Sequence, residues 1–254
     1  MGAVIMRLYG TIIVAILLTV PASGQVASPQ LPDLPAPPPW ARPEGPPPES
    51  FKLDVRRGDE WRYEVRDFLT HEVKAELTFV VADVLADEID VRVTSLNPTT
   101  KVEKTFPMRF DRDWRLIENP QILIKDRTEP SSVLDHPEIG KSWVYSYGLM
   151  HKSNGFTKTF YGRARIVAWE RIVLGSGQAY DAFKIERRET DVRPADKDVA
   201  TGAAPTASRV DVLTRDWWAP AVNRPVRGLF MTRINGRLLE GTDTGLIEYQ
   251  RRSD

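Results

Sequence analysis

Apolar and charged residues alternate along most of the chain from Phe51 onward. Trp61, Tyr63 and Val65 alternate with Arg, Glu and Arg, and several later stretches repeat this pattern. Because neighbouring side chains of a strand point to opposite faces, a period of two residues indicates strands with one buried face. No long window beyond the N-terminal segment has the 3.6-residue period of a helix. We therefore predict an all-β, antiparallel domain of about ten to twelve strands.

The clearest predicted hairpin joins residues 226–234 to residues 237–249 through Asn235-Gly236. Asn-Gly is the strongest two-residue turn signal, because both residues tolerate positive φ. Residues 126–140 are polar and connect two groups of predicted strands. Pro130 and Pro137 within this connection leave room for one short helix.

Two short phrases occur twice, in the same order. The pattern G-x-x-W-x-Y begins at Gly58 and again at Gly140, and R-D-W begins at Arg112 and again at Arg215. A repeated unit that cannot bury its apolar face alone gains a core by packing against its copy. Chance recurrence of such short phrases is the alternative.

The recurrence predicts two repeat-related halves, residues 51–125 and 138–254, that form a strongly curved sheet, a half-barrel or a sandwich. Trp61 and Trp143 should then occupy equivalent places. In a strand the Arg and Asp of each R-D-W phrase would face opposite sides, so they are not expected to pair with each other.

The first 24 residues read as a signal peptide. An apolar run from Leu8 to Val20 follows Arg7, and Ala22-Ser23-Gly24 then offers small residues for cleavage before Gln25. This predicts export to the periplasm or beyond. The alternative is an uncleaved membrane anchor through residues 3–20, and Met6 rather than Met1 is an alternative start.

Residues 25–50 are predicted to be a proline-rich, disordered linker. Half of the chain's 20 prolines lie between Pro29 and Pro48. Proline fixes φ and donates no backbone hydrogen bond, so neither helix nor sheet is expected. The linker is a passive spacer or an arm that docks a protein partner, and Trp40 within it is a candidate for docking back on the domain.

Charge and composition exclude some functions. Basic and acidic residues number 35 each, so the basic excess of a typical nucleic-acid binder is missing. The absence of cysteine excludes disulfides, thiolate metal sites and a thiol nucleophile.

Six aromatic residues are candidates for ligand binding, since each combines a large apolar body with a polar tip. Packing in the core is the competing interpretation for all of them. The candidates are Trp61, Tyr63, Trp143, Tyr145, Trp217 and Trp218.

We assign no catalytic residue, metal ligand or cofactor from the sequence. His71, His136 and His151 stand far apart, and none has the spacing of a zinc protease. Nucleophile-elbow, P-loop and dinucleotide motifs do not occur. Nothing in the sequence indicates that the acids Asp113 and Asp216 converge, as a paired-carboxylate site would require.

Three stretches resemble a group of secreted bacterial all-β proteins labelled TapB-like, a domain of unknown function. They are the Gly58–Tyr63 phrase, the stretch W-W-A-P-x-V-x-x-P-V-R at 217–227, and D-A-F-K-I at 181–185. Asn223 stands where the group tends to have glycine, and the turn before the last stretch matches only loosely. The resemblance implies an exported β domain over about 51–254 and implies no catalytic residue.

Three functions remain open. The first is a non-catalytic exported envelope protein that binds a hydrophobic or polymeric ligand, or a protein partner, on the curved sheet. The second is a structural or assembly factor that docks a partner through its proline-rich arm. The third is a hydrolase that uses loop carboxylates and a histidine. Convergence of two carboxylates in one pocket would favour the third.

Overall fold

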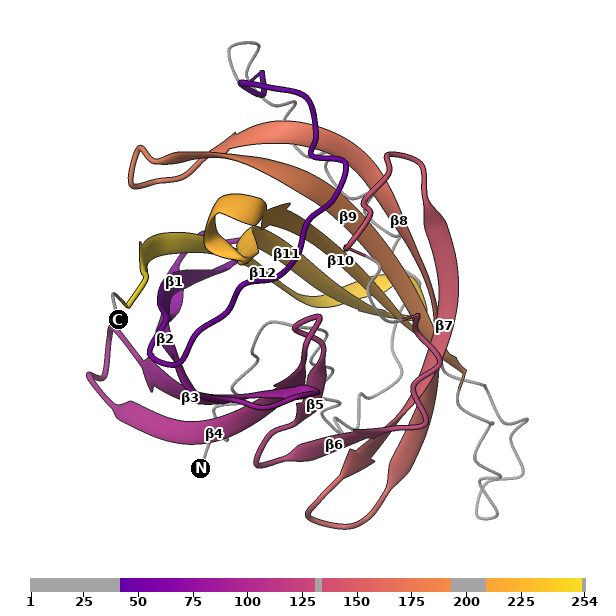
Figure 1. Cartoon of the computed structure of the whole chain (residues 1–254). Helices are drawn as coiled ribbons and strands as arrows, with labels where there is room; N and C mark the ends of the chain where they lie inside the picture. Colours follow the sequence, from indigo (N-terminus) through magenta and orange to yellow (C-terminus); the bar gives the residue numbers. More distant parts are fainter. Residues whose placement is uncertain (1–41, 131–133, 193–208, 253–254) are drawn as a thin grey trace, which may run out of the picture.

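Twelve antiparallel strands form one sheet that curls round a central space (Figure 1). The computed structural model describes residues 42–130, 134–192 and 209–252. Each strand pairs with its neighbours in sequence. The strands are β1 (Glu60–Asp67), β2 (Val73–Val84), β3 (Glu88–Leu96), β4 (Glu103–Asp111), β5 (Leu116–Glu118), β6 (Ile122–Lys125), β7 (Ser142–His151), β8 (Thr157–Val173), β9 (Ala179–Val192), β10 (Arg209–Ala219), β11 (Arg224–Ile234) and β12 (Arg237–Gln250), with a short 3-10 turn, η1 (Pro220–Val222), before β11.

The sheet closes into a barrel because β12 pairs with β1, from Glu60 opposite Gln250 to Asp67 opposite Thr242. The antiparallel all-β class and the strand count are confirmed, whereas the half-barrel and the sandwich are wrong. An up-and-down sheet with an even number of strands brings its last strand antiparallel to its first. Pairing of the two removes the free edges that an open sheet would expose.

Alternate residues of most strands point inward and form the core. In β1, Trp61, Tyr63 and Val65 are 0%, 3% and 5% exposed, and Phe79 of β2 packs edge-on against Tyr63. Burial of these large side chains is the main favourable term in folding. The inner face is therefore filled largely by the protein's own side chains.

The wall of the barrel is thinnest at β5 and β6. These strands have three and four residues, and one residue pair, Glu118 opposite Leu123, joins them. Strand β4 pairs with β5 only at Arg109 and Phe110. Pro107 therefore lies where β4 has no second partner strand, a position that tolerates the missing N–H of proline.

Both copies of G-x-x-W-x-Y enter their strands in the same backbone conformation. Gly58 and Gly140 have φ of 88° and 96°, a region that favours glycine. Their amides donate to Val81 and Ile166 of the next strand, each over 2.8 Å, and the amides of those two residues donate back to the residue after each glycine.

The R-D-W phrases, in contrast, lie in different structures. Arg112-Asp113-Trp114 forms the turn between β4 and β5, with Trp114 at a φ of 59°, whereas Arg215-Asp216-Trp217 lies within β10. The strand geometry that separates Arg from Asp therefore applies to the second phrase and not to the first. Repetition of the two whole halves stays a prediction.

Residues 42–59 cross one end of the barrel before β1 begins, as the indigo trace of Figure 1 shows. Arg171 of β8 pairs with Glu44 at 2.6 Å, Phe51 donates its amide to Asp135, and Asp54 donates its amide to Asn223. We call this segment the strap. The predicted signal peptide, residues 25–41 with Trp40, residues 131–133 of the short-helix region between Pro130 and Pro137, and residues 193–208 lie outside the described residues.

The described residues contain no helix that is long and apolar enough to span a membrane.

Candidate functional site: a polar cavity inside the barrel

The inward face of β9 changes from apolar to charged along the strand. Phe183 and Ile185 are fully buried, and Arg187 and Glu189 continue in the same two-residue phase. Asp216 of β10 lies directly opposite Ile185 and is likewise turned inward. A polar cluster therefore sits inside the barrel beside the aromatic core.

Glu189 is 1% exposed and is held by two tyrosines of β7. Tyr145 donates its hydroxyl to one carboxylate oxygen over 2.7 Å, and Tyr147 donates to the other over 2.8 Å. Burial raises the pKa of Glu189 to about 7, although these two hydrogen bonds and nearby Arg187 act in the opposite direction. Burial, together with Glu189, also raises the pKa of both tyrosines.

Arg187 links two further carboxylates. Its Nη1 lies 2.8 Å from Asp216, and its Nε lies 3.9 Å from Glu129. Glu129 also accepts a 2.9 Å hydrogen bond from the indole of Trp143. Burial raises the pKa of Asp216 to about 6, against the lowering effect of Arg187.

A second ion-pair group closes the thin side of the barrel. Arg115 contacts Asp111 at 2.7 Å and Asp113 at 3.0 Å, and it donates to two backbone carbonyls of the β6–β7 connection. Arg127 lies 3.5 Å from Asp111 and donates to the carbonyl of Leu116 over 2.7 Å. These contacts join β4, β5 and the turn between them to the β6–β7 connection.

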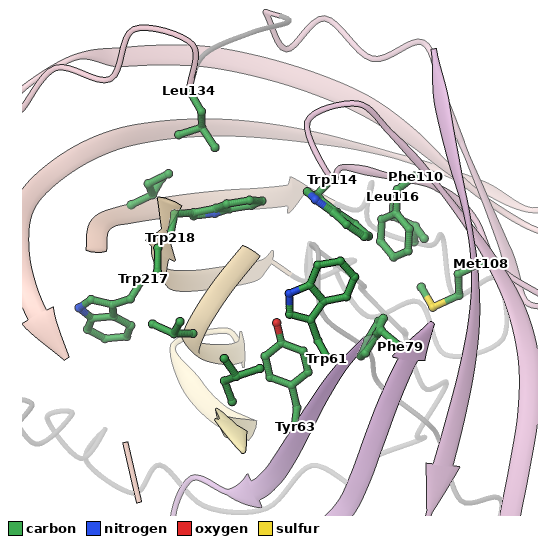
Figure 2. Close-up of a cluster of buried hydrophobic side chains, with 14 of the residues drawn as sticks. Trp61, Tyr63, Phe79, Met108, Phe110, Trp114, Leu116, Leu134, Trp217 and Trp218 are labelled. Carbon is green, nitrogen blue, oxygen red and sulfur yellow. The ribbon is translucent and has the colours of Figure 1, made fainter. Parts of the chain in front are cut away.

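Arg224 differs from these arginines because aromatic rings surround it in place of carboxylates. Its side chain is buried, and its guanidinium carbon lies 4.1 Å from the ring centre of Trp114 and 4.2 Å from that of Phe79. The ring centres of Trp61, Tyr63 and Phe110 also lie within 6 Å of this guanidinium carbon. Figure 2 shows these five rings gathered on one side of the cluster. No carboxylate of the described residues forms an ion pair with Arg224.

Four buried N–H groups, all on residues that line one cavity, have no hydrogen-bond partner among the described residues. They are Nε and Nη1 of Arg224 and the indole Nε1 of Trp114 and of Trp218. All three residues line a cavity of about 40 Å³ together with Arg187 and Glu189. Each unpaired buried donor lowers the stability of the fold by roughly 1–3 kcal/mol. Four such donors in one place therefore indicate a site for a ligand that supplies hydrogen-bond acceptors.

Backbone strain coincides with this site. Trp114 has a φ of 59°, a region that a bulky residue rarely adopts and that costs of order 1–3 kcal/mol. The strained turn places its indole against the guanidinium of Arg224 and edge-on to Trp61. Asn223, at a φ of 56°, precedes Arg224 and exchanges two hydrogen bonds with the backbone of Asp54 in the strap.

Four of the six predicted aromatic residues gather at or next to the cavity. Trp218 and Tyr145 line it. Trp61 and Tyr63 pack around Arg224, and their polar tips donate to the carbonyls of Val222 and Pro225, each over 2.8 Å. Whether any of them binds a ligand stays a prediction.

The other two predicted aromatic residues lie elsewhere. Trp143 lines a smaller cavity, of about 20 Å³, that shares Arg187 and Trp218 with the first. Figure 2 shows Trp217 pointing away from Trp218. Trp217 belongs to the outer face of β10, where Lys184 and Arg227 lie over its ring.

Sequence reasoning missed Arg224, Arg187, Glu189 and Trp114. For Arg187 and Glu189 a signal exists, because they stand in phase with Phe183 and Ile185 and so belong on the buried face. Arg224 follows a proline-containing turn and carries no such signal. The described residues contain no cluster of His, Asp and Glu that could hold a metal ion.

Comparison with known proteins identifies no family for this chain. No protein-family model matches it, and no curated protein matches it. The resemblance to TapB-like proteins therefore stays a prediction.

Solved structures of related shape were found at low identity. A predicted lipoprotein from Parabacteroides distasonis is 13% identical, with a TM-score of 0.48, over 79% of this chain and 99% of that one. A predicted exported protein with a YmcC-like fold from Bacteroides fragilis is 12% identical, with a TM-score of 0.49, over 80% and 100%. The predicted lipoprotein YmcC from Escherichia coli is 9% identical, with a TM-score of 0.43, over 78% and 87%. These are remote likenesses, and we draw no functional conclusion from them.

Proposed function

We propose that this protein is a non-catalytic, exported binding protein of the cell envelope that encloses a small ligand inside its barrel. The observation that carries the proposal is the set of four unpaired N–H donors around one buried cavity. The inner face, which the sequence led us to expect as an open platform for an apolar or polymeric ligand, is occupied by packed aromatic side chains. Binding therefore belongs in the cavity.

The state of the carboxylates supports binding over catalysis. Both oxygens of Glu189 accept hydrogen bonds from tyrosines, and Asp216 is paired with Arg187. Asp113 and Glu129 contact Arg115 and Trp143. Each acid of the cavity wall is thus engaged, and the unsatisfied groups are donors.

One observation favours the hydrolase alternative. Asp113, Glu129, Glu189 and Asp216 converge on a single cavity, and burial raises the pKa of Glu189 and Asp216 into the range of catalytic acids. A cavity of about 40 Å³ holds about three water molecules, far less than a sugar or peptide substrate. We therefore rank hydrolysis second. Docking of a partner through the proline-rich arm stays a prediction.

The test compares two arginines of β11. Arg224→Met removes the unpaired donors, and Arg227→Met removes an outward arginine that pairs with Asp243 at 2.7 Å. Without ligand, we expect Arg224→Met to be as stable as the wild type or more stable by roughly 1–3 kcal/mol, because it removes buried unsatisfied donors. Urea unfolding measures this difference.

Ligand binding is then screened by calorimetry and thermal shift with a mixture of small carboxylates, phosphates, amides and sugars. A compound that binds the wild type and Arg227→Met but not Arg224→Met supports the proposal. If no compound binds the wild type, the proposal is overturned. Recovery of a hydrolysed product by mass spectrometry, lost in Glu189→Gln, would favour the hydrolase instead.

A further inference from the structure

The chemistry of the unpaired groups specifies the ligand of the proposed site. All four are N–H donors, two on a guanidinium and two on indoles. Neither group can accept a hydrogen bond, so the complementary ligand atoms must be acceptors. The two unpaired guanidinium nitrogens, Nε and Nη1, lie on different edges of the group, so they offer donors to acceptor oxygens on two sides of it.

Charge favours an anion over a neutral acceptor. Arg224 is fully buried among rings, and no carboxylate of the described residues lies within ion-pair distance of it. A buried cation is normally paired or bound to a ligand. A ligand anion would supply the missing counter-charge.

The same wall argues against a doubly charged ligand. Arg115, Arg127 and Arg187 are already paired with carboxylates, which leaves Arg224 as the one arginine of the wall without such a partner. A dianion would bring a second charge close to Asp216 and Glu129, and like charges in a buried site repel strongly.

The volume of the cavity also favours a small monoanion. A cavity of about 40 Å³ accommodates about three water-sized atoms, since each needs roughly 10–15 Å³ measured in this way. Formate has three heavy atoms and acetate four, whereas phosphate has five. Leu116 and Pro225 in the wall offer apolar contact to a short alkyl end.

We infer that the cavity binds a short monocarboxylate, with its oxygens on the guanidinium N–H groups of Arg224 and on the indole N–H groups of Trp114 and Trp218. This inference rests on the proposed function, because it names the ligand class of the same site. The alternative occupant is a group of buried water molecules, which the experiment below distinguishes.

The experiment titrates the full mature chain with sodium acetate, acetamide and inorganic phosphate at pH 7.5. Sodium chloride at equal ionic strength controls for salt. Isothermal calorimetry and tryptophan fluorescence report binding, since Trp61 and Trp114 lie beside Arg224. We expect acetate to bind and its uncharged isostere acetamide and phosphate to bind at least ten-fold more weakly.

Three variants locate the binding. Arg224→Met should abolish it. Trp114→Phe and Trp218→Phe keep an aromatic ring and remove the N–H together with the five-membered ring, so each should weaken acetate by roughly ten-fold, the effect of one hydrogen bond to a charged group. These two variants keep the test decisive if Arg224→Met does not fold. Arg227→Met should bind acetate as the wild type does.

The outcomes separate the two proposals. If phosphate or acetamide binds and acetate does not, the ligand class is wrong and the binding function stands. If acetate binds equally to Arg224→Met and both tryptophan variants, the assigned site is wrong. If none of the anions, amides or other screened compounds binds, the cavity holds water alone and both proposals fall.

Discussion

At the scale of single residues, burial controls the chemistry of the barrel interior. Glu189 is almost fully enclosed, and its carboxylate is stabilised only by two tyrosine hydroxyls and a neighbouring arginine. Transfer of a charge from water into such surroundings costs more than these contacts return, so the pKa rises. Arg224 shows the opposite case, in which burial lowers the pKa of a cation.

The raised pKa of Glu189 makes stability depend on pH. In the unfolded chain this carboxyl loses its proton near pH 4.5, whereas in the folded protein it keeps the proton until about pH 7. Between these values the unfolded state binds fewer protons than the folded state, so the folded protein loses stability as the pH rises. The contribution of Glu189 to stability is therefore full below pH 4.5 and is lost as the pH rises to about 7. At about 1.4 kcal/mol for each pH unit between the two values, the loss is roughly 3 kcal/mol.

Glu189→Gln removes this titration and keeps a side chain that can bond both tyrosines. We expect the free energy of unfolding of the wild type to fall relative to that of the variant between pH 5 and pH 7.5. Urea unfolding at several pH values measures the difference, in which other titrating groups, such as Asp216, cancel to first order. Parallel pH profiles for the two proteins would show that Glu189 does not hold its proton in the folded state.

Asn223 adopts a backbone conformation that few residues other than glycine adopt easily. Its φ of 56° is a left-handed conformation that glycine adopts freely and that asparagine tolerates better than most residues. Asparagine at this position also bonds the strap through Asp54. Glycine and asparagine thus satisfy the same backbone requirement immediately before Arg224.

At the scale of elements, a cross-strand pair of tyrosine and glycine holds β7 and β8 in place beneath the polar cluster. Tyr145 lies directly opposite Gly162, and its ring covers the glycine. A Cβ built on Gly162 would lie 2.4 Å from the Tyr145 ring. The hydrogen bond from Tyr145 to Glu189 depends on this ring position.

Gly162→Ala should therefore displace the Tyr145 ring and destabilise the protein by roughly 1–3 kcal/mol, as overpacked core variants do. Gly245→Ala is the matched control, because a Cβ there meets no atom within 4 Å and β12 has ordinary strand geometry at that position. Thermal unfolding of both variants measures the effect. Equal melting temperatures for the two would contradict the packing argument.

At the scale of the whole molecule, closure of the barrel pairs the two ends of the domain. Strands β1 and β12 are paired over eight positions, and β5 and β6 over one. The pairing that joins the first strand to the last is thus far more extensive than the pairing between two consecutive short strands. Local stability should follow this distribution of hydrogen bonds.

Amide hydrogen exchange tests this arrangement. Because β1 is paired on both sides, we expect the amides of Arg62 and Glu64 and those of their partners in β12 to exchange slowly. We expect the same of the amides of β9 and β10. Amides of β5 and β6 should exchange fastest among the strands. Fast exchange along one full edge of β1 or β12 would indicate an open sheet and contradict closure.

The sequence by itself determined the local structure. Alternating residues predicted the strands, and Asn235-Gly236 predicted a turn in which both residues have positive φ, 50° and 80°. These features follow from steric limits on φ and from side-chain alternation, which act between near neighbours in the chain. The same alternation contained the inward phase of Arg187 and Glu189, although their charge led us to overlook it.

Only the tertiary structure decided closure of the sheet and the content of its interior. The pairing of Glu60 with Gln250 joins residues at opposite ends of the domain, and nothing local marks it. The site likewise combines Trp114 from a strained turn with Trp218 and Arg224 from β10 and β11. Whether a buried donor meets an acceptor depends on which distant segments share its surroundings, and sequence spacing does not record that. The unpaired donors of Arg224 became visible only when the barrel was closed around them.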